Sequence, residues 1–256
     1  GAIHLIYQYT DIGYFRVGYT AKPAGGAWSP GIQIFGSGAF SSGSAAMVMD
    51  PLGVVHAVAE IGSGSMLHQI KYRRYIPTSV RWTDTETITG SDSECFSPQL
   101  AIDRSGDIYV VYNFVHREYQ VDTASIKVVK RTAGVWGAPF EIALVPNVSV
   151  SHSTGQESPT IQVAGDGTVA IAWSGLGWEP HPDVYALLVS ETRDKGLTWT
   201  APKPIVATED MQTMGAQMMF ASQPKSANPP GGYGVLFTLA VRNVAYALVS
   251  GACLTA

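Results

Sequence analysis

The stretch Thr192-Arg193-Asp194-Lys195-Gly196-Leu197-Thr198-Trp199 decides the fold of this chain. A hydroxyl and a carboxylate two residues apart can hydrogen-bond the N–H groups of their own turn. Glycine readily takes the left-handed backbone conformation, and tryptophan can anchor a hairpin in a core. We therefore predict a hairpin turn in which Thr192, Asp194, Gly196 and Trp199 have structural roles.

The tryptophan that ends this stretch recurs along the chain. Trp28, Trp82, Trp136 and Trp199 are 54, 54 and 63 residues apart. A second shared phrase, a short apolar run, a turn with glycine and a longer apolar run, begins at residues 47, 100 and 161. Repeats of this length with four strands each are typical of propeller blades.

The repeats predict an all-β fold, a β-propeller of about five four-stranded antiparallel blades. The first unit enters at its second strand and the last stops after its third, so both terminal blades are incomplete. We expect a single domain, 1–256, with approximate blades 1–40, 41–94, 95–156, 157–210 and 211–256. A piece of a larger propeller is the alternative, and a homo-oligomer is also compatible with incomplete blades.

The 192–199 stretch resembles the Asp-box of sialidase-like (BNR repeat) propellers, and the openings Ser97–Asp103 and Ser158–Ile161 are similar to that family as well. The resemblance implies a triad of arginines, a tyrosine nucleophile with a glutamate partner, and an aspartate acid/base. This chain departs from the family's Arg-Ile-Pro motif. Phe15-Arg16-Val17-Gly18 lacks the proline, and Arg74-Tyr75-Ile76-Pro77 has an extra residue.

Composition excludes several classes of protein. Charged residues make up 14% of the chain and apolar residues 46%, which argues against disorder. The net charge is −4 and the 16 basic residues are scattered, so we expect no nucleic-acid partner.

Cys95 and Cys253 allow either one bridge or two buried thiols. The apolar stretch 234–256 has Arg242 at its centre, which favours a hairpin of strands 235–241 and 244–249 over a membrane span.

The predicted functional sector lies on long loops of the third and fourth blades. These are Val115–Asp122 and Ser174–Asp183, with the connection Pro146–Glu157 between them. Flat aromatic rings beside paired polar groups suit a sugar ring. The candidate ligand-binding residues are Trp178, Tyr119, His116, Arg117, His152, Gln156 and His181. The candidate catalytic carboxylates are Glu157, Glu179, Asp183 and Glu118.

Two functions follow from this sector. The first is a carbohydrate- or receptor-binding module, secreted, on a cell surface or on a virion, whose partner is a glycan or a cell-surface receptor. The second is an exo-acting glycoside hydrolase, which needs two carboxylates about 5–9 Å apart. The three histidines of the sector have no metal-ligand spacing, so no metal and no cofactor are predicted.

Overall fold

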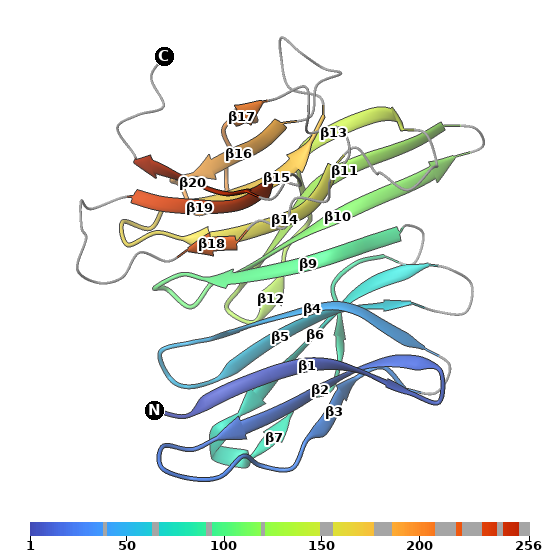
Figure 1. Cartoon of the computed structure of the whole chain (residues 1–256), viewed down its shortest axis with the longest axis vertical. Coiled ribbons are helices and arrows are strands. Elements are labelled where there is room, and N and C mark those ends of the chain that lie inside the picture. Colours follow the sequence, from blue (N-terminus) through green and yellow to red (C-terminus); the bar gives the residue numbers. More distant parts are fainter. Residues whose placement is uncertain are drawn as a thin grey trace. The chain divides into compact units, whose positions relative to one another are not determined.

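The computed structural model describes residues 1–37, 40–62, 67–90, 94–118, 121–148, 156–176, 186–207, 219–221, 232–239 and 243–250. These residues form five antiparallel β-sheets that follow one another along the chain (Figure 1). One short 3-10 turn, η1 (Pro77–Ser79), lies among the described residues. Apart from it, the described structure is strands and turns, which confirms the all-β prediction.

The first two sheets occupy the N-terminal part of the chain. The first contains β1 (Ile3–Asp11), β2 (Tyr14–Lys22) and β3 (Ile32–Phe35), in that order. The second contains β4 (Ser41–Met49), β5 (Val55–Gly62), β6 (His68–Ile76), β7 (Arg81–Trp82) and β8 (Glu86–Thr87). Both β7 and β8 pair with β6, so the outer strand of this sheet is divided in two.

The other three sheets follow the same scheme. The third contains β9 (Glu94–Ile102), β10 (Ile108–Glu118), β11 (Val121–Thr132), β12 (Val135–Trp136) and β13 (Phe140–Val148), the last two both paired with β11. The fourth contains β14 (Gln156–Val163), β15 (Val169–Gly175), β16 (Ala186–Thr192) and β17 (Lys203–Ala207). The fifth contains β18 (Met219–Ala221), β19 (Gly232–Leu239) and β20 (Asn243–Ser250). Three-stranded sheets at both ends and four-position sheets between them agree with the predicted set of blades.

The same turn joins the first two strands of the second, third and fourth sheets. In each turn the N–H of the first residue donates to the carbonyl four positions on, at 2.9, 3.0 and 2.7 Å. A glycine with φ between 83 and 91° occupies the fourth position, in a region that other residues enter at a cost. The turns begin at Asp50, Asp103 and Ala164, and their glycines are Gly53, Gly106 and Gly167. The structure thus repeats where the sequence repeats.

Burial is concentrated in the inner strands of the full sheets, and all seven residues of the third strand β16 are buried. All seven residues of β15 are buried, and in β5 only Ile61 is partly exposed. Strands that are apolar on nearly every residue need cover on both faces, and sheets packed face to face supply it. The scarcity of charged residues follows from this packing.

The chain divides into two compact units, Gly1–Leu100 and Ala101–Ala256. In the first unit, a cluster of Val17, Tyr19, Ile34, Phe35, Ala57 and Ala59 packs the first sheet on the second. In the second unit a larger cluster, with Trp173 fully buried, joins strands of the third and fourth sheets. That residues 1–256 form one domain stays a prediction.

The C-terminal apolar stretch forms strands. β19 pairs with β20 in antiparallel register from Gly232↔Ser250 to Leu239↔Asn243, as the hairpin interpretation predicted. Among the described residues, no helix has the length and apolar character needed to cross a membrane. Cys95 is fully buried, and Cys253 lies outside the described residues.

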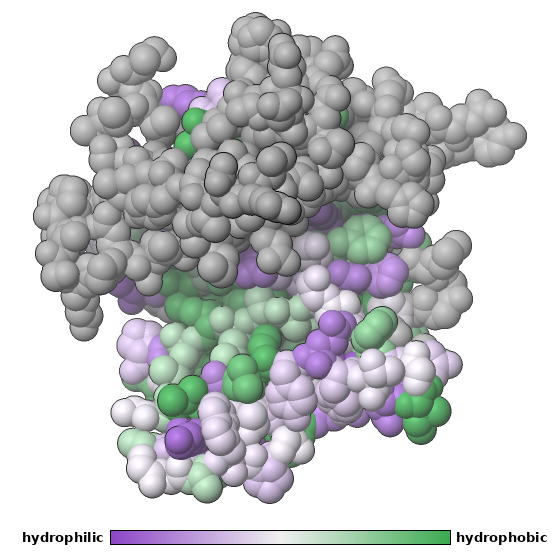
Figure 2. All heavy atoms as spheres, viewed as in Figure 1, coloured by the Kyte–Doolittle hydropathy of each residue, from purple (hydrophilic) through white to green (hydrophobic). Residues whose placement is uncertain are grey.

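The first unit also exposes apolar side chains. Ile3, Phe15 and Trp28 are 57%, 52% and 47% exposed. Its face in Figure 2 mixes hydrophobic and hydrophilic residues.

Candidate functional site

One edge of the third sheet carries the first predicted loop. At this edge Arg117 pairs with Asp122 and Glu118 with Val121, where β10 turns into β11. Asp122 also pairs with Val148, the last residue of β13. The β10–β11 connection and the end of β13 therefore lie at the same edge.

The fourth sheet continues from this edge. The chain passes from Val148 through residues 149–155 to Gln156, which pairs with Gly175 at the end of β15. Gly175 in turn pairs with Ala186 at the start of β16. Within the second unit, the strands that flank the connecting segments 119–120, 149–155 and 176–185 are thus paired or consecutive. This set of strand ends is called the loop edge below.

Part of the predicted site lies at the loop edge, although the structure describes few of its side chains. Arg117, Glu118, Gln156 and Glu157 lie at strand ends, and only their backbone is described. The predicted residues that lie outside the described residues are Tyr119, His152, Trp178, Glu179, His181 and Asp183. The sugar platform and the carboxylate pair stay predictions.

The interpretation of Val115–Asp122 as a long loop is wrong. β10 runs on to Glu118 and β11 begins at Val121, so residues 119–120 alone connect them. The residues at 115, 121 and 123 are β-branched and lie on both sides of the charged residues. Residues of this type favour strands, so the strands extend through the charged part of the sequence. Polar composition indicated a loop, whereas this part of the chain is an extended hairpin.

His116 is the one predicted ligand residue whose side chain is described. Its ring stacks on Phe114, with centroids 6.4 Å apart and 7° between the planes. The ammonium of Lys127 lies 3.3 Å from the centroid of the Phe114 ring. Lys127 also approaches Glu141 at 4.0 Å. The row formed by Lys127, Phe114 and His116 fixes the His116 ring on the β10 surface next to the loop edge.

The 192–199 turn makes the hydrogen bonds expected from its spacing. Thr192 Oγ1 donates to Asp194 Oδ1 at 2.7 Å and accepts from the Gly196 N–H at 2.9 Å. The Thr198 N–H donates to Asp194 Oδ1 at 2.9 Å. These donors hold the pKa of Asp194 well below its usual range, with the Thr198 hydroxyl contributing most. Trp199 packs against the core of the second unit, so the turn stabilises the fold.

A polar residue recurs at one position of the second strands. Glu60, Asn113 and Ser174 each lie ten residues after the first residue of the repeated turn, and all three are buried. Gln8 is their counterpart in the first sheet. Like Glu60, it follows by four residues a histidine that hydrogen-bonds a tyrosine hydroxyl: His4 with Tyr19 at 2.6 Å and His56 with Tyr72 at 2.7 Å.

In the first unit this position connects one sheet to the next through a bulge. The pairing of β4 with β5 shifts between Ser42 and Ala45. Gln8 donates from its amide to the carbonyls of Ser42 and Gly43 in that bulge, at 2.9 and 3.4 Å. Glu60 accepts the N–H of Ser97, at 3.2 Å, from the following strand β9, where φ is 51° at Ser97.

Glu60 lies in a polar group that sequence reasoning missed. Burial raises its pKa, while the N–H groups of Ser97 and Ser44 and the nearby His68 oppose that rise. His68 Nε2 is 3.9 Å from its carboxylate. Because this carboxylate accepts the N–H groups of Ser44 and Ser97, it positions the β4 bulge relative to β9. A single acid within the apolar run 54–61 was the available signal.

Arg16, in the motif compared above with the sialidase family, is 4% exposed. Its Nη1 donates to the carbonyl of Phe40, and its Nε is 3.8 Å from Asp11. The guanidinium also lies 5.2 Å from the Tyr14 ring. Arg16 therefore fixes the connection from the first sheet to the second.

Comparisons with known proteins show the fold and no closer kinship. No protein-family model and no curated protein matches the chain. A Dyadobacter fermentans protein of unknown function is 12% identical, with a TM-score of 0.65, over 100% of this chain and 77% of its own. A PL25 ulvan lyase is 9% identical, with a TM-score of 0.59, over 97% of this chain and 61% of its own.

The sialidase NanB of Streptococcus pneumoniae is 12% identical, with a TM-score of 0.53, over 88% of this chain and 32% of its own. The chain thus spans about 61% of the ulvan lyase and a third of the sialidase. The expected sialidase-like β-propeller architecture is confirmed as a fold.

Proposed function

We propose that the protein is a carbohydrate-binding propeller whose glycan or receptor site lies on the loop edge of the third and fourth sheets. The observation that carries the proposal is the pairing of the strand ends at the loop edge, between which segments 119–120, 149–155 and 176–185 connect the strands. Loops on a rigid scaffold are where binding sites usually lie. The proposed location, secreted or on a cell or virion surface, suits such a partner.

The same fold carries carbohydrate chemistry in other proteins. The ulvan lyase structure is described as bound to a glucuronate-rhamnose sulfate unit, and NanB is a sialidase. These are different reactions on one architecture, so the fold alone supports a saccharide ligand without choosing between binding and turnover.

A second candidate function is exo-acting glycoside hydrolysis, favoured by the backbone positions of two candidate acidic residues. Glu118 ends β10 and Glu157 stands one residue into β14, both at the loop edge. Together with Glu179 and Asp183 they supply enough acids for a pair. Binding is ranked first because the sialidase-type Arg-Ile-Pro motif is absent.

A glycan array combined with hydrolysis of chromogenic glycosides separates the two functions. Binding without turnover supports the first. Turnover that Glu157→Gln or Glu179→Gln abolishes establishes the second, and neither binding nor turnover contradicts both.

Trp178→Ala should weaken saccharide binding about 5- to 150-fold, because loss of a stacking ring costs about 1–3 kcal/mol. Trp28→Ala is the matched control, since Trp28 is an exposed tryptophan between β2 and β3. Equal affinity of the Trp178→Ala variant and the wild type would remove Trp178 from the site.

A further inference from the structure

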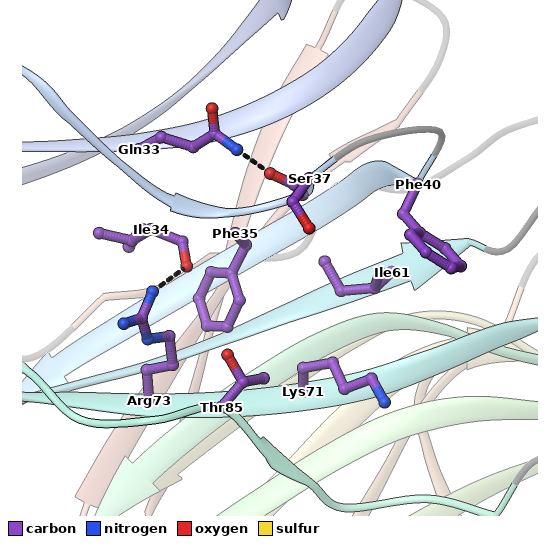
Figure 3. Close-up of a pocket in the computed structure, with 10 residues that line it drawn as sticks. Gln33, Ile34, Phe35, Ser37, Phe40, Ile61, Lys71, Arg73 and Thr85 are labelled. Atoms are coloured by element: carbon purple, nitrogen blue, oxygen red, sulfur yellow. Dashed lines mark hydrogen bonds between the residues drawn. The ribbon is translucent and has the colours of Figure 1, made fainter.

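A pocket of about 370 Å³ lies in the first unit, between the first and second sheets. Its walls come from the end of β3, the end of β5, the middle of β6 and the segment between β7 and β8 (Figure 3). This volume falls in the lower part of the range of small-molecule sites, about 300–1,000 Å³. A single sugar residue is the size of ligand that such a pocket holds.

One part of the wall is apolar and aromatic. Phe35 is 4% exposed and Phe40 is 46% exposed, so one ring forms the floor and the other stands at the surface. Figure 3 shows Phe35 in the middle of the group, with Ile61 and Phe40 to one side. Aromatic and aliphatic surfaces of this kind accept the C–H face of a pyranose ring.

The other part of the wall is cationic. Lys71 and Arg73 stand on the same face of β6, two residues apart, and both line the pocket. Lys71 Nζ donates to Gln69 Oε1 at 2.8 Å and to Thr87 Oγ1 at 2.7 Å. Both acceptors are neutral, and an ammonium has three donors. Within the described residues, Lys71 forms no ion pair.

Two hydrogen bonds to backbone carbonyls fix the Arg73 side chain in the wall of the pocket. Its Nη1 donates to the Ile34 carbonyl and its Nε to the Thr83 carbonyl, each at 2.7 Å. A guanidinium has five N–H groups, so these two bonds leave donors for a ligand. Among the ten described residues that line the pocket, none is acidic. Burial lowers the pKa values of Lys71 and Arg73, and the charge of Asp84 opposes that shift at Arg73. A bound anion would further offset the cost of burial.

From this combination we propose that the pocket binds a sugar residue that carries an anionic group. The ring lies against Phe35 and Phe40, and its carboxylate or sulfate meets Lys71 and Arg73. The ligand chemistry is an acidic saccharide, and the site is separate from the loop edge because all its residues belong to the first unit. The proposal stands or falls independently of the function proposed above.

Calorimetric titration of the full chain tests the proposal. The ligands are methyl glucuronide, a sulfated methyl glucoside, neutral methyl glucoside and sodium sulfate. We expect one of the two acidic sugars to bind at least tenfold more tightly than methyl glucoside, and the preferred one identifies the anion. Equal affinity for the neutral sugar, equal affinity for sulfate alone, or no binding of any acidic sugar would overturn the proposal.

Variants locate the binding. Lys71→Gln should weaken binding of the acidic sugar at least tenfold, and Lys22→Gln, a lysine of the first sheet outside the pocket, should leave it unchanged. Phe40→Ala, at an exposed position, should weaken it severalfold and covers the case in which Lys71→Gln fails to fold. No loss of binding in Phe40→Ala would place the ligand elsewhere.

Discussion

The first and second sheets carry a hydrogen-bonding side chain at the same position of the repeat. In the first sheet this side chain is a donor, and in the second it is an acceptor. Gln8 on the exposed β1 donates an amide to carbonyls of the β4 bulge, whereas Glu60 on the buried β5 accepts N–H groups from the β4 bulge and from Ser97 in β9. The neutral side chain stands on the more exposed strand, and the charged one is 9% exposed. The polarity at this position therefore depends on which backbone groups the bulge presents, and solvent access does not decide it.

The largest expected effect comes from filling the space beside Glu60. A Cβ at Gly43 would lie 2.4 Å from Glu60 Oε1 and 2.5 Å from its Cδ. Gly43→Ala must displace the carboxylate from its backbone donors, so we expect a loss of about 2–4 kcal/mol in the free energy of unfolding. Urea denaturation measures it. Ser44→Ala, at the exposed neighbouring position, is the control, and an equal effect of both substitutions would contradict the assignment.

The second prediction compares the loss of the His–Tyr hydrogen bond in the first sheet with its loss in the second sheet. Tyr72 is fully buried, whereas Tyr19 is 3% exposed and its partner His4 is half-buried. Tyr72→Phe should cost about 1–2 kcal/mol and Tyr19→Phe about 0.5–1 kcal/mol, because a deeper histidine loses its partner at greater cost. Thermal unfolding of both variants checks the order, and a larger loss in Tyr19→Phe would reverse it.

The charge of Glu60 should make stability pH-dependent through the second sheet. Because the folded-state pKa is raised from 4.5, the folded chain binds the proton more tightly than the unfolded chain. The contribution of Glu60 is fully present below pH 4.5 and decreases as pH rises through the folded-state value.

Glu60→Gln should remove this dependence. Denaturation from pH 4 to 8 measures the difference between the wild type and the variant, and a difference that does not change with pH would contradict the raised pKa. Glu94 and His68 lie near Glu60 in both proteins. Gln8→Glu would place the charge in the first sheet, facing carbonyls, and should destabilise at neutral pH.

The smallest effect is expected at the 192–199 turn, which is exposed. The lowered pKa of Asp194 stabilises the fold above its usual pKa of 3.8, and this contribution is lost as pH falls through the folded-state value. Asp194→Asn should lower the melting temperature slightly at pH 7, and the gap should close in acid. Arg193→Gln is the control, and an equal decrease at both pH values would refute the electrostatic origin.

The fold was predictable because its signals are local and repeated. Tryptophan spacing and the glycine of each strand-joining turn indicate hairpins. Hairpins that recur at a regular spacing along the chain indicate blades. Strand ends were harder to predict, since charged residues such as Arg117 and Glu118 continue β10 when a partner strand is present. Composition alone cannot separate an exposed hairpin from a loop.

The candidate sites were less accessible to sequence reasoning. The pocket of the first unit combines Phe35 and Phe40 with Lys71 and Arg73, and no motif links these residues. The single carboxylate in the apolar run of β5 was the one signal for the role of Glu60. The role of Glu60 depends on the N–H of Ser97, which belongs to a strand of another sheet.

The hydrogen bonds that Glu60 accepts also affect the motions of the first unit. One carboxylate receives N–H groups from Ser44 in β4 and Ser97 in β9, two strands that do not pair with each other. Any fluctuation that releases the side chain exposes both amides to solvent at once. Amide hydrogen exchange at Ser44 and Ser97 should therefore occur through a shared opening event, which makes Glu60 a point where local breathing of two sheets is coupled.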